Sequence, residues 1–186
     1  MLGADDLVTW SPRRIAVAGI TGAGKTTLAR RITAATGIPH TEIDGLFHGE
    51  GWTRRPTFET DVDAVTAGPS WVVEWQYPTA REAIAARADT LVWLDLPTRV
   101  SLYRVTARTI RRRRSNAQLW NGNREGPLLD FFSDPDHVIR WAIHTRNTLR
   151  WMVPDAQSSH PHLTVVRLRS QREVDRWMTQ LTGGAV

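Results

Sequence analysis

The residues best suited to chemistry in this chain follow a short apolar run. From Gly19 to Thr26 the sequence reads Gly-Ile-Thr-Gly-Ala-Gly-Lys-Thr, which matches the G-x-x-x-x-G-K-[ST] pattern of a P-loop. Glycines let the backbone wrap closely enough for its N–H groups to point at phosphate oxygens. A helix that starts here turns the positive end of its dipole towards the same phosphates. The pattern therefore predicts a nucleotide site.

Each polar side chain of this loop has a predicted role. Lys25 would place its ammonium against the β- and γ-phosphates, and Thr26 would offer its hydroxyl to Mg²⁺, which prefers oxygen ligands. We therefore expect ATP and Mg²⁺ as cofactors, with no reaction specified by the motif itself. The predicted cofactor-binding residues of the loop are Gly19, Thr21, Gly22, Ala23, Gly24, Lys25, Thr26 and Thr27.

The lysine of this loop is the only lysine in the chain. The sequence has 24 Lys+Arg, and every one except Lys25 is an arginine, for a formal net charge of +5. A preference for arginine needs no functional cause. Its one exception falls where a compact ammonium must fit inside a phosphate-wrapping loop, and a guanidinium fork would be too broad.

The composition limits the classes of protein and of functional site that the chain can represent. With 186 residues, 41% hydrophobic and 23% charged, the chain is predicted to be a single globular domain, 1–186. The absence of cysteine excludes disulfides, Cys-ligated zinc and cysteine nucleophiles, and the histidines lack metal-ligand spacing. No apolar run approaches the roughly 20 residues of a membrane span, and the acidic start is unlike a secretory signal. We expect a cytoplasmic protein.

The elements that would position this chemistry alternate along the chain. Short apolar runs alternate with helical patterns, which is typical of βαβ units and a parallel sheet. Thr57 is a predicted N-cap, and Ser170 with Glu173 a predicted capping box. The predicted strands are 15–19, 40–43, 71–75, 90–96 and 163–168; the predicted helices are 25–36, 58–67, 79–88, 98–114, 136–152 and 170–181, with a loop over 45–56 and irregular structure over 115–135.

From Arg14 to about Arg176 the chain resembles the adenylate-kinase-related P-loop proteins, and in particular the group called DNA topology modulation proteins. Besides the P-loop, the segments that carry the resemblance are 43–48 with Gly51-Trp52, 71–74, 87–97 and 119–125. The resemblance implies an α/β fold of the P-loop NTPase class: a three-layer α/β/α sandwich whose five-stranded parallel sheet has the order 2-3-1-4-5, as in nucleoside monophosphate kinases. It also implies ATP at the P-loop, an acceptor site over the carboxyl ends of the strands and a lid-like insertion at about 104–135.

Three acidic residues follow predicted strands. Asp44 would close the second strand and orient or deprotonate an acceptor hydroxyl, or touch the Mg²⁺ water shell; the alternative is an ordinary Asp-Gly turn. By the resemblance, Glu74 would lie near Mg²⁺, so that Thr26 and Glu74 form the predicted metal site; the alternative is a strand-end surface residue. Asp95 is interpreted as structural. Trp75-Gln76 stands where the resembling group has Gly-Asn, which predicts a narrowed or reshaped acceptor pocket.

Arginines supply the remaining candidates. By the resemblance, Arg104 and Arg108 are lid residues that contact the nucleotide; the alternative is a solvated basic helix end. Arg54, Arg55 and Arg81 are candidates for binding an anionic acceptor, with a solvated loop or a surface ion pair as alternatives. The predicted catalytic residues are Lys25, Asp44, Glu74 and Arg108; the predicted substrate-binding residues are Asp44, Arg54, Arg55 and Arg81.

Three functions remain open. The first is a small-molecule or nucleotide kinase that transfers the γ-phosphoryl group of ATP to a small, anionic acceptor. The second is an ATP-binding regulator that contacts nucleic acid through its basic helix end, which is not favoured because the net charge is modest and no nucleic-acid-binding motif is present. The third is an ATPase-type switch, which the unusual Trp75 would favour. Trp52 and Trp120 lie in predicted loops, where either could stack on a base or close over substrate. No membrane partner is expected, and the oligomeric state stays open.

Overall fold

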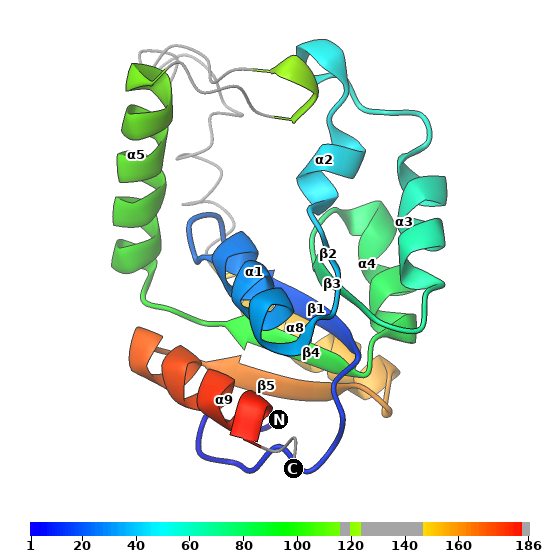
Figure 1. Ribbon diagram of the computed structural model, residues 1–186, viewed down its shortest axis with the longest axis vertical. Helices are drawn as coiled ribbons and strands as arrows, with labels where there is room; N and C mark the ends of the chain where they lie inside the picture. The colour runs from blue at the N-terminus through cyan, green and yellow to red at the C-terminus, as the bar shows by residue number, and fades with distance from the viewer. Residues whose placement is uncertain (116–119, 124–146, 184–186) are drawn as a thin grey trace.

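A five-stranded parallel sheet forms the centre of the molecule in the computed structural model, which describes residues 1–115, 120–123 and 147–183 (Figure 1). The strand order is β2-β3-β1-β4-β5, as the sequence predicts. All four neighbouring pairs run parallel. The strands are β1 (Arg14–Gly19), β2 (His40–Thr41), β3 (Trp71–Glu74), β4 (Thr90–Leu94) and β5 (Thr164–Leu168).

Helices cover both faces of this sheet, which completes the predicted three layers (Figure 1). On one face Ile15 and Val17 of β1 pack with α1 (Lys25–Thr36) and α9 (Gln171–Gly183). On the other face Ala16 and Ala18 pack with α3 (Phe58–Thr66), α4 (Pro78–Arg87) and α8 (Leu149–Ser159). The strands are apolar on both faces because a parallel sheet in this architecture is buried on both sides.

One long helix and three short ones lie beyond the carboxyl ends of the strands. The long helix, α5 (Thr98–Arg114), rises from β4 and stands away from the sheet (Figure 1). Between β2 and α3 the chain forms α2 (Ile43–Phe47) and the 3₁₀ turn η1 (Glu50–Trp52). A second 3₁₀ turn, η2 (Trp120–Gly122), contacts both α2 and η1.

The second strand and the loop after it differ from the prediction. We expected a strand over 40–43 and a loop over 45–56, but β2 ends at Thr41 and α2 begins at Ile43. The reason is tertiary. The Ile43 side chain is fully buried in the core, and its N–H donates to the Glu74 carboxylate (N–Oε2 3.1 Å). This bond satisfies a backbone donor in the first turn of α2, so Asp44 stands on a helix rather than at a strand end.

Other boundaries shift by a few residues. The third and fourth strands end at Glu74 and Leu94, earlier than predicted. Thr57 lies at the N-cap of α3, but its hydroxyl donates to Asp61 and makes no capping bond. Ser170 does cap α9, since it accepts the Glu173 N–H at 3.2 Å. Residues 136–146 of the predicted helix 136–152, and residues 116–119 and 124–135 of the lid-like insertion, lie outside the described residues. In the part of the chain that the structure describes, no helix is long and apolar enough to cross a membrane.

Candidate active site

The P-loop connects β1 to α1 and presents an open helix terminus. Gly22 and Gly24 adopt positive φ angles of 81° and 100°, which glycine tolerates without strain. Gly24 is the N-cap of α1, where no side chain caps the helix, and the first turn contains no acidic residue. The N–H groups of this turn therefore face the site with their positive dipole end. Such a terminus fits the phosphates of a nucleotide.

Lys25 lies beneath this loop. Its Nζ donates to the carbonyl of Gly19 at 3.0 Å, so the ammonium is held inside the curve of the loop. Burial lowers the pKa of Lys25 below its usual value, and the carboxylates of Asp44 and Glu74 act in the opposite direction. The charges of Arg108 and Arg81 add to the lowering. The ammonium, two carboxylates and two guanidinium groups are thus within electrostatic range of one another.

Glu74 joins the end of β3 to the P-loop. Glu74 is 2% exposed, and its Oε1 accepts the Thr26 hydroxyl at 2.9 Å. The same oxygen lies 3.2 Å from Nε2 of His40, while Oε2 accepts the Ile43 N–H. Burial raises the pKa of Glu74, but the hydrogen bond and charge of His40 and the other two donors outweigh it and lower the pKa. Glu74 is therefore a carboxylate beside the Thr26 hydroxyl, and these hard oxygen ligands suit Mg²⁺.

A cavity of about 440 Å³ opens beside the P-loop. It lies between α1, α5 and α9, and Arg104 and Arg108 of α5 line it. Arg104 reaches across the cavity entrance, since it donates to the Ala23 carbonyl (3.4 Å) and to Oε1 of Gln171 on α9 (3.1 Å). Tyr103, which is 75% exposed, lies on the same wall. The cavity thus opens directly onto Gly22, Ala23 and Gly24 of the P-loop.

Gly22 is where α5 presses on the P-loop. A Cβ at this position would lie 2.2 Å from the carbonyl oxygen of Ser101, so Gly22→Ala must displace α5 or the loop. Gly37 is a matched control, because it has a φ of 74° and a Cβ there would meet nothing within 4 Å. We expect Gly37→Ala to lower the free energy of unfolding by about 1 kcal/mol through backbone strain alone. Gly22→Ala should lose about 1–3 kcal/mol more from the collision, as measured by urea denaturation. Equal losses would show that α5 does not press on the loop.

Asp44 faces the same region from α2. Its Oδ1 accepts hydrogen bonds from Nε2 of Gln76 and from the Tyr77 hydroxyl at 2.7 Å. Within the described residues, Oδ2 of Asp44 receives no hydrogen bond. Burial and the charge of Asp44 raise the pKa of Tyr77, so its hydroxyl stays a proton donor to the carboxylate. Asp44 is thus fixed through one oxygen, and the other is available to a hydroxyl of a ligand.

Gln76 and Tyr77 are functional candidates that sequence reasoning did not assign. They directly follow β3, and Tyr77 holds a φ of 63°, which is rare for a residue other than glycine. Its ring stacks on Phe47 of α2 at 4.0 Å between centroids. The departure of Gln76 from the pattern of the resembling group was the available signal. The role of Gln76 depends on its hydrogen bond to Asp44, which lies far away in sequence and close in space.

Arg81 of α4 is a half-buried arginine without an acidic partner among the described residues. Burial lowers its pKa, its Nε has no hydrogen-bond partner in the described structure, and no described carboxylate forms an ion pair with it. Its guanidinium lies 5.6 Å from the ring centroid of Trp75, whose Nε1 donates to the Arg81 carbonyl at 2.9 Å. Trp75 itself is 4% exposed and belongs to the core. Trp75 therefore packs against Arg81 from the core, and whether it narrows or reshapes an acceptor pocket stays a prediction.

Arg54 and Arg55 are placed differently from Arg81. Arg54 pairs with Glu59, and Arg55 pairs with Asp61 at 3.0 Å, both on α3. Two acidic side chains thus balance the positive charges that we expected to meet an acceptor. Arg55 also donates from Nη1 to the Gly45 carbonyl at 3.4 Å, next to Asp44, and the Arg54 guanidinium lies 5.9 Å from the centroid of the Phe47 ring.

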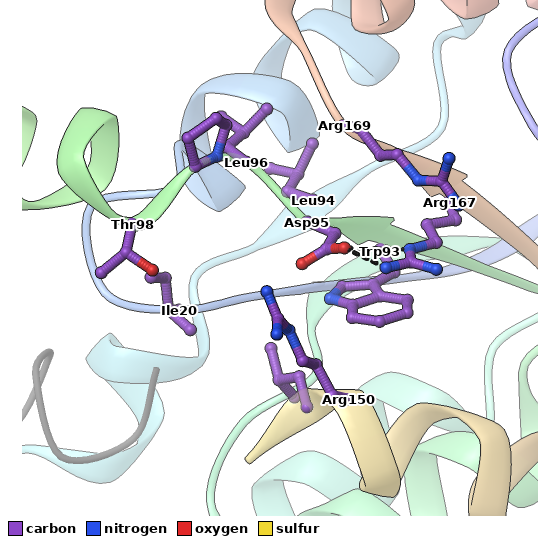
Figure 2. Close-up of a pocket in the computed structure, with 11 residues that line it drawn as sticks. Ile20, Trp93, Leu94, Asp95, Leu96, Thr98, Arg150, Arg167 and Arg169 are labelled. Carbon is purple, nitrogen blue, oxygen red and sulfur yellow. Dashed lines mark hydrogen bonds and ion pairs between the residues drawn. The ribbon is translucent and has the colours of Figure 1, made fainter. Parts of the chain in front are cut away.

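Asp95 has a structural partner, as the sequence interpretation holds. Its Oδ2 accepts Nε of Arg167 at 2.9 Å, and the Arg167 guanidinium lies 4.5 Å from the centroid of the Trp93 ring. Figure 2 shows this pair on the wall of a second cavity of about 240 Å³, into which Arg150 of α8 also extends. Glu74 and not Asp95 is the acid that contacts the P-loop. The described residues contain no cluster of three or more His, Asp or Glu side chains that could hold a metal ion by themselves.

Solved structures share the fold of this chain. The chain is similar to a gluconokinase from Sinorhizobium meliloti 1021, with 19% identity, coverage of 94% of both chains and a TM-score of 0.53. It is also similar to the shikimate kinases of Acinetobacter baumannii (15% identity, 92% of this chain and 91% of that chain, TM-score 0.55) and Bacteroides thetaiotaomicron (15% identity, 92% and 97%, TM-score 0.53). No protein-family model matches the sequence, and no curated protein matches it. The chain has the fold of the P-loop kinases, with the five-stranded sheet and flanking helices of that fold.

Proposed function

We propose that this protein is a small-molecule kinase that transfers the γ-phosphoryl group of ATP to a hydroxyl of a small anionic acceptor. One observation carries the proposal. Glu74 accepts hydrogen bonds from the Thr26 hydroxyl of the P-loop and from the N–H of Ile43, so Asp44, a carboxylate suited to a hydroxyl, directly follows a residue that is tied to the phosphate site. Arg81, a half-buried cation without a described acidic partner, lies on the helix after the strand that ends at Glu74. The acceptor groups and the phosphate site therefore belong to one cluster. We further propose that the chain is related to the DNA topology modulation proteins, as the resemblance of its sequence implies.

On the ATP side, the chain supplies positive charge and position. The N–H groups of the P-loop and the Lys25 ammonium would bind the β- and γ-phosphates. Thr26 and Glu74 would hold Mg²⁺, which offsets the negative charge of the phosphates when it is bound. Arg104 would lie along the nucleotide, and Arg108 would stabilise the charge that develops on the transferred group.

On the acceptor side, Asp44 and Arg81 would have different roles. Oδ2 of Asp44 would accept the proton of the acceptor hydroxyl and orient its oxygen towards the γ-phosphorus. The new bond forms between these two atoms while the bond from the γ-phosphorus to its bridging oxygen breaks. Arg81 would bind an anionic group of the same molecule. A carboxylate at the point of attack repels a phosphate acceptor, so we favour a hydroxy acid over a nucleoside monophosphate.

An ADP-release assay tests the proposal. Gluconate and shikimate represent hydroxy acids, and AMP, CMP and the corresponding nucleosides represent the nucleotide class. We expect a hydroxy acid to accelerate ADP release above the acceptor-free rate, with Lys25→Ala as the control for contaminating kinases. Acceleration by AMP or CMP alone would show that the acceptor class is wrong. Slow ADP release that no acceptor accelerates would favour an ATPase-type switch.

Arg81→Met should impair use of the acceptor selectively. The substitution keeps the apolar stem beside Trp75 and Met152 and removes the charge. A hydrogen bond to a charged group contributes about 1.5–3 kcal/mol, so KM for the acceptor should rise about 10- to 100-fold while KM for ATP stays constant. Arg87→Met is the matched control on the same helix, because Arg87 pairs with Asp63 at the surface. Equal effects of the two variants on acceptor KM would contradict the role of Arg81.

A further inference from the structure

The second cavity, at the carboxyl ends of β4 and β5, is separate from the cavity beside the P-loop glycines (Figure 2). Its volume is about 240 Å³, and Ile20 forms part of its lining. Leu94 and Leu96 line both cavities, so the end of β4 and the residues after it stand between them. The proposed phosphoryl transfer makes no use of this second cavity, which we call the arginine cavity.

Three arginines and one carboxylate line the arginine cavity. Figure 2 shows Arg150 entering from α8, and Arg167 and Arg169 entering from β5 and the residue that follows it. Arg167 pairs with Asp95 and lies over the ring of Trp93, so its position is fixed. Asp95 is the only acidic residue among the described residues of the lining, and Arg167 balances its charge. The other two arginines therefore leave two positive charges in excess.

These two arginines have no acidic partner in the part of the chain that the structure describes. Glu173, the acid nearest to Arg169 in sequence, accepts the backbone N–H of Arg169 at 2.8 Å and makes no ion pair with its guanidinium. Many other arginines of this chain do pair, as Arg30 does with Glu42. Like charges that line one cavity repel each other, and apolar walls strengthen the repulsion. The cavity therefore carries a positive potential, which favours an anion.

The rest of the lining indicates what kind of anion fits. Trp93, Leu94 and Leu149 are buried and apolar, and Ile20 adds a further apolar side chain. An inorganic ion would leave these walls uncovered, whereas a short carbon chain would cover them. Small-molecule sites have this composition, in which apolar walls surround a few charged groups that fix the orientation. The volume lies below the range of about 300–1,000 Å³ that is usual for larger ligands.

We propose that the arginine cavity binds a small organic molecule with two oxyanion groups, each a carboxylate or a phosphate, and that Arg150 and Arg169 bind these groups. A planar guanidinium holds either group through two parallel hydrogen bonds. The inference goes beyond the proposed function and does not depend on phosphoryl transfer. Since Leu94 and Leu96 separate the two cavities, this ligand and a nucleotide would be bound at the same time.

Calorimetric titration with three probes tests the site. Succinate carries two carboxylates, 3-phosphoglycerate carries a carboxylate and a phosphate, and inorganic phosphate has no carbon chain. At constant ionic strength, we expect succinate or 3-phosphoglycerate to bind about tenfold more tightly than inorganic phosphate, because carbon atoms become buried. Arg150→Gln and Arg169→Gln should each weaken this binding about 10- to 100-fold, because hydrogen bonds between charged groups are lost. The probe that binds more tightly identifies the second oxyanion as a carboxylate or a phosphate.

Two control variants locate the binding. Arg172→Gln removes the same charge from an exposed position of α9 outside the arginine cavity. Lys25→Ala weakens the P-loop, which also attracts anions. Both should bind the organic probe like wild type.

The proposal would be overturned by an equal loss of affinity in Arg172→Gln, or by a loss that occurs in Lys25→Ala and not in the cavity variants. It would also be overturned if neither organic probe bound, or if inorganic phosphate bound equally well. Arg150 and Arg169 are exposed, so both cavity variants should keep the wild-type unfolding temperature, and a loss of affinity in them reports on the site.

Discussion

Replacing Lys25 with alanine is expected to abolish ATP-dependent turnover and to leave the free energy of unfolding nearly unchanged. In the structure the ammonium donates to the Gly19 carbonyl, and no described carboxylate forms an ion pair with it. Burial lowers the pKa of Lys25, which means that its positive charge is less favourable in the folded protein than in water. Removing that charge costs the fold little and deprives the phosphates of their cation.

The size of the loss follows from the chemistry. A single preorganised hydrogen-bond donor at a developing charge increases the rate about a hundred- to a thousandfold. The full positive charge of Lys25 at the transferred phosphoryl group should contribute more than the lower of these values. We therefore expect kcat/KM for ATP to fall at least about a hundredfold. Steady-state ADP release and urea denaturation measure the two parts of the prediction. An active Lys25→Ala protein would refute the P-loop assignment.

Lys25→Arg is the matched variant. It keeps the positive charge, but the guanidinium is broader than an ammonium and cannot occupy the same curve of the loop. We expect it to be nearly as inactive as the alanine variant. Because Lys25 is the only lysine, an amine-selective reagent should modify only this residue and the N-terminus. Bound ATP should protect Lys25 from that reagent, which gives a readout independent of turnover.

The P-loop could be predicted residue by residue because its geometry is local. Gly19, Gly24 and Lys25 define the turn, and β1 and α1 flank it as the alternation of apolar residues predicts. The sheet order 2-3-1-4-5 was implied by the family resemblance, and the pairing of the strands confirms it. The role of each loop residue towards ATP stays a prediction.

The surroundings of Asp44 could not be predicted, because they depend on contacts between distant segments. Its helix begins where Glu74 accepts the Ile43 N–H, more than thirty positions away. Its orientation depends on Gln76 and Tyr77, and its segment is hydrogen-bonded by Trp120 and Asn123. No local pattern in α2 contains this information.

The burial of Trp75, in contrast, could be predicted from the local sequence. It continues the alternation of Trp71 and Val73, and residues two apart in a strand share a face. All three side chains lie in the same core cluster. The resembling group has a glycine at the position of Trp75, and this difference drew attention to the acceptor pocket. The two-residue period of the strand indicated instead that the Trp75 side chain is buried.

Glu74→Gln is expected to reduce kcat at least about a hundredfold while nucleotide binding persists. The carboxylate accepts three donors, namely the Thr26 hydroxyl, the His40 imidazole and the Ile43 N–H. A glutamine has one acceptor oxygen, so if that oxygen keeps the Ile43 N–H, the NH₂ group faces Thr26 and His40, and the Thr26 hydroxyl must turn from donor to acceptor. The variant therefore loses both the negative charge for Mg²⁺ and part of the alignment of Thr26.

The dependence on Mg²⁺ separates this role from a structural one. Glu74→Gln should need a higher Mg²⁺ concentration for half-maximal rate, whereas a merely loosened fold would lower the rate at every concentration alike. Asp95→Asn is the control, because Asp95 directly follows β4 and pairs with Arg167. Its turnover should stay within a few-fold of wild type, with the wild-type Mg²⁺ dependence. If Asp95→Asn shifts the Mg²⁺ dependence and Glu74→Gln does not, Asp95 is the metal-side acid. The hydrogen bond between Thr26 and Glu74 would then serve only to hold α1 against β3.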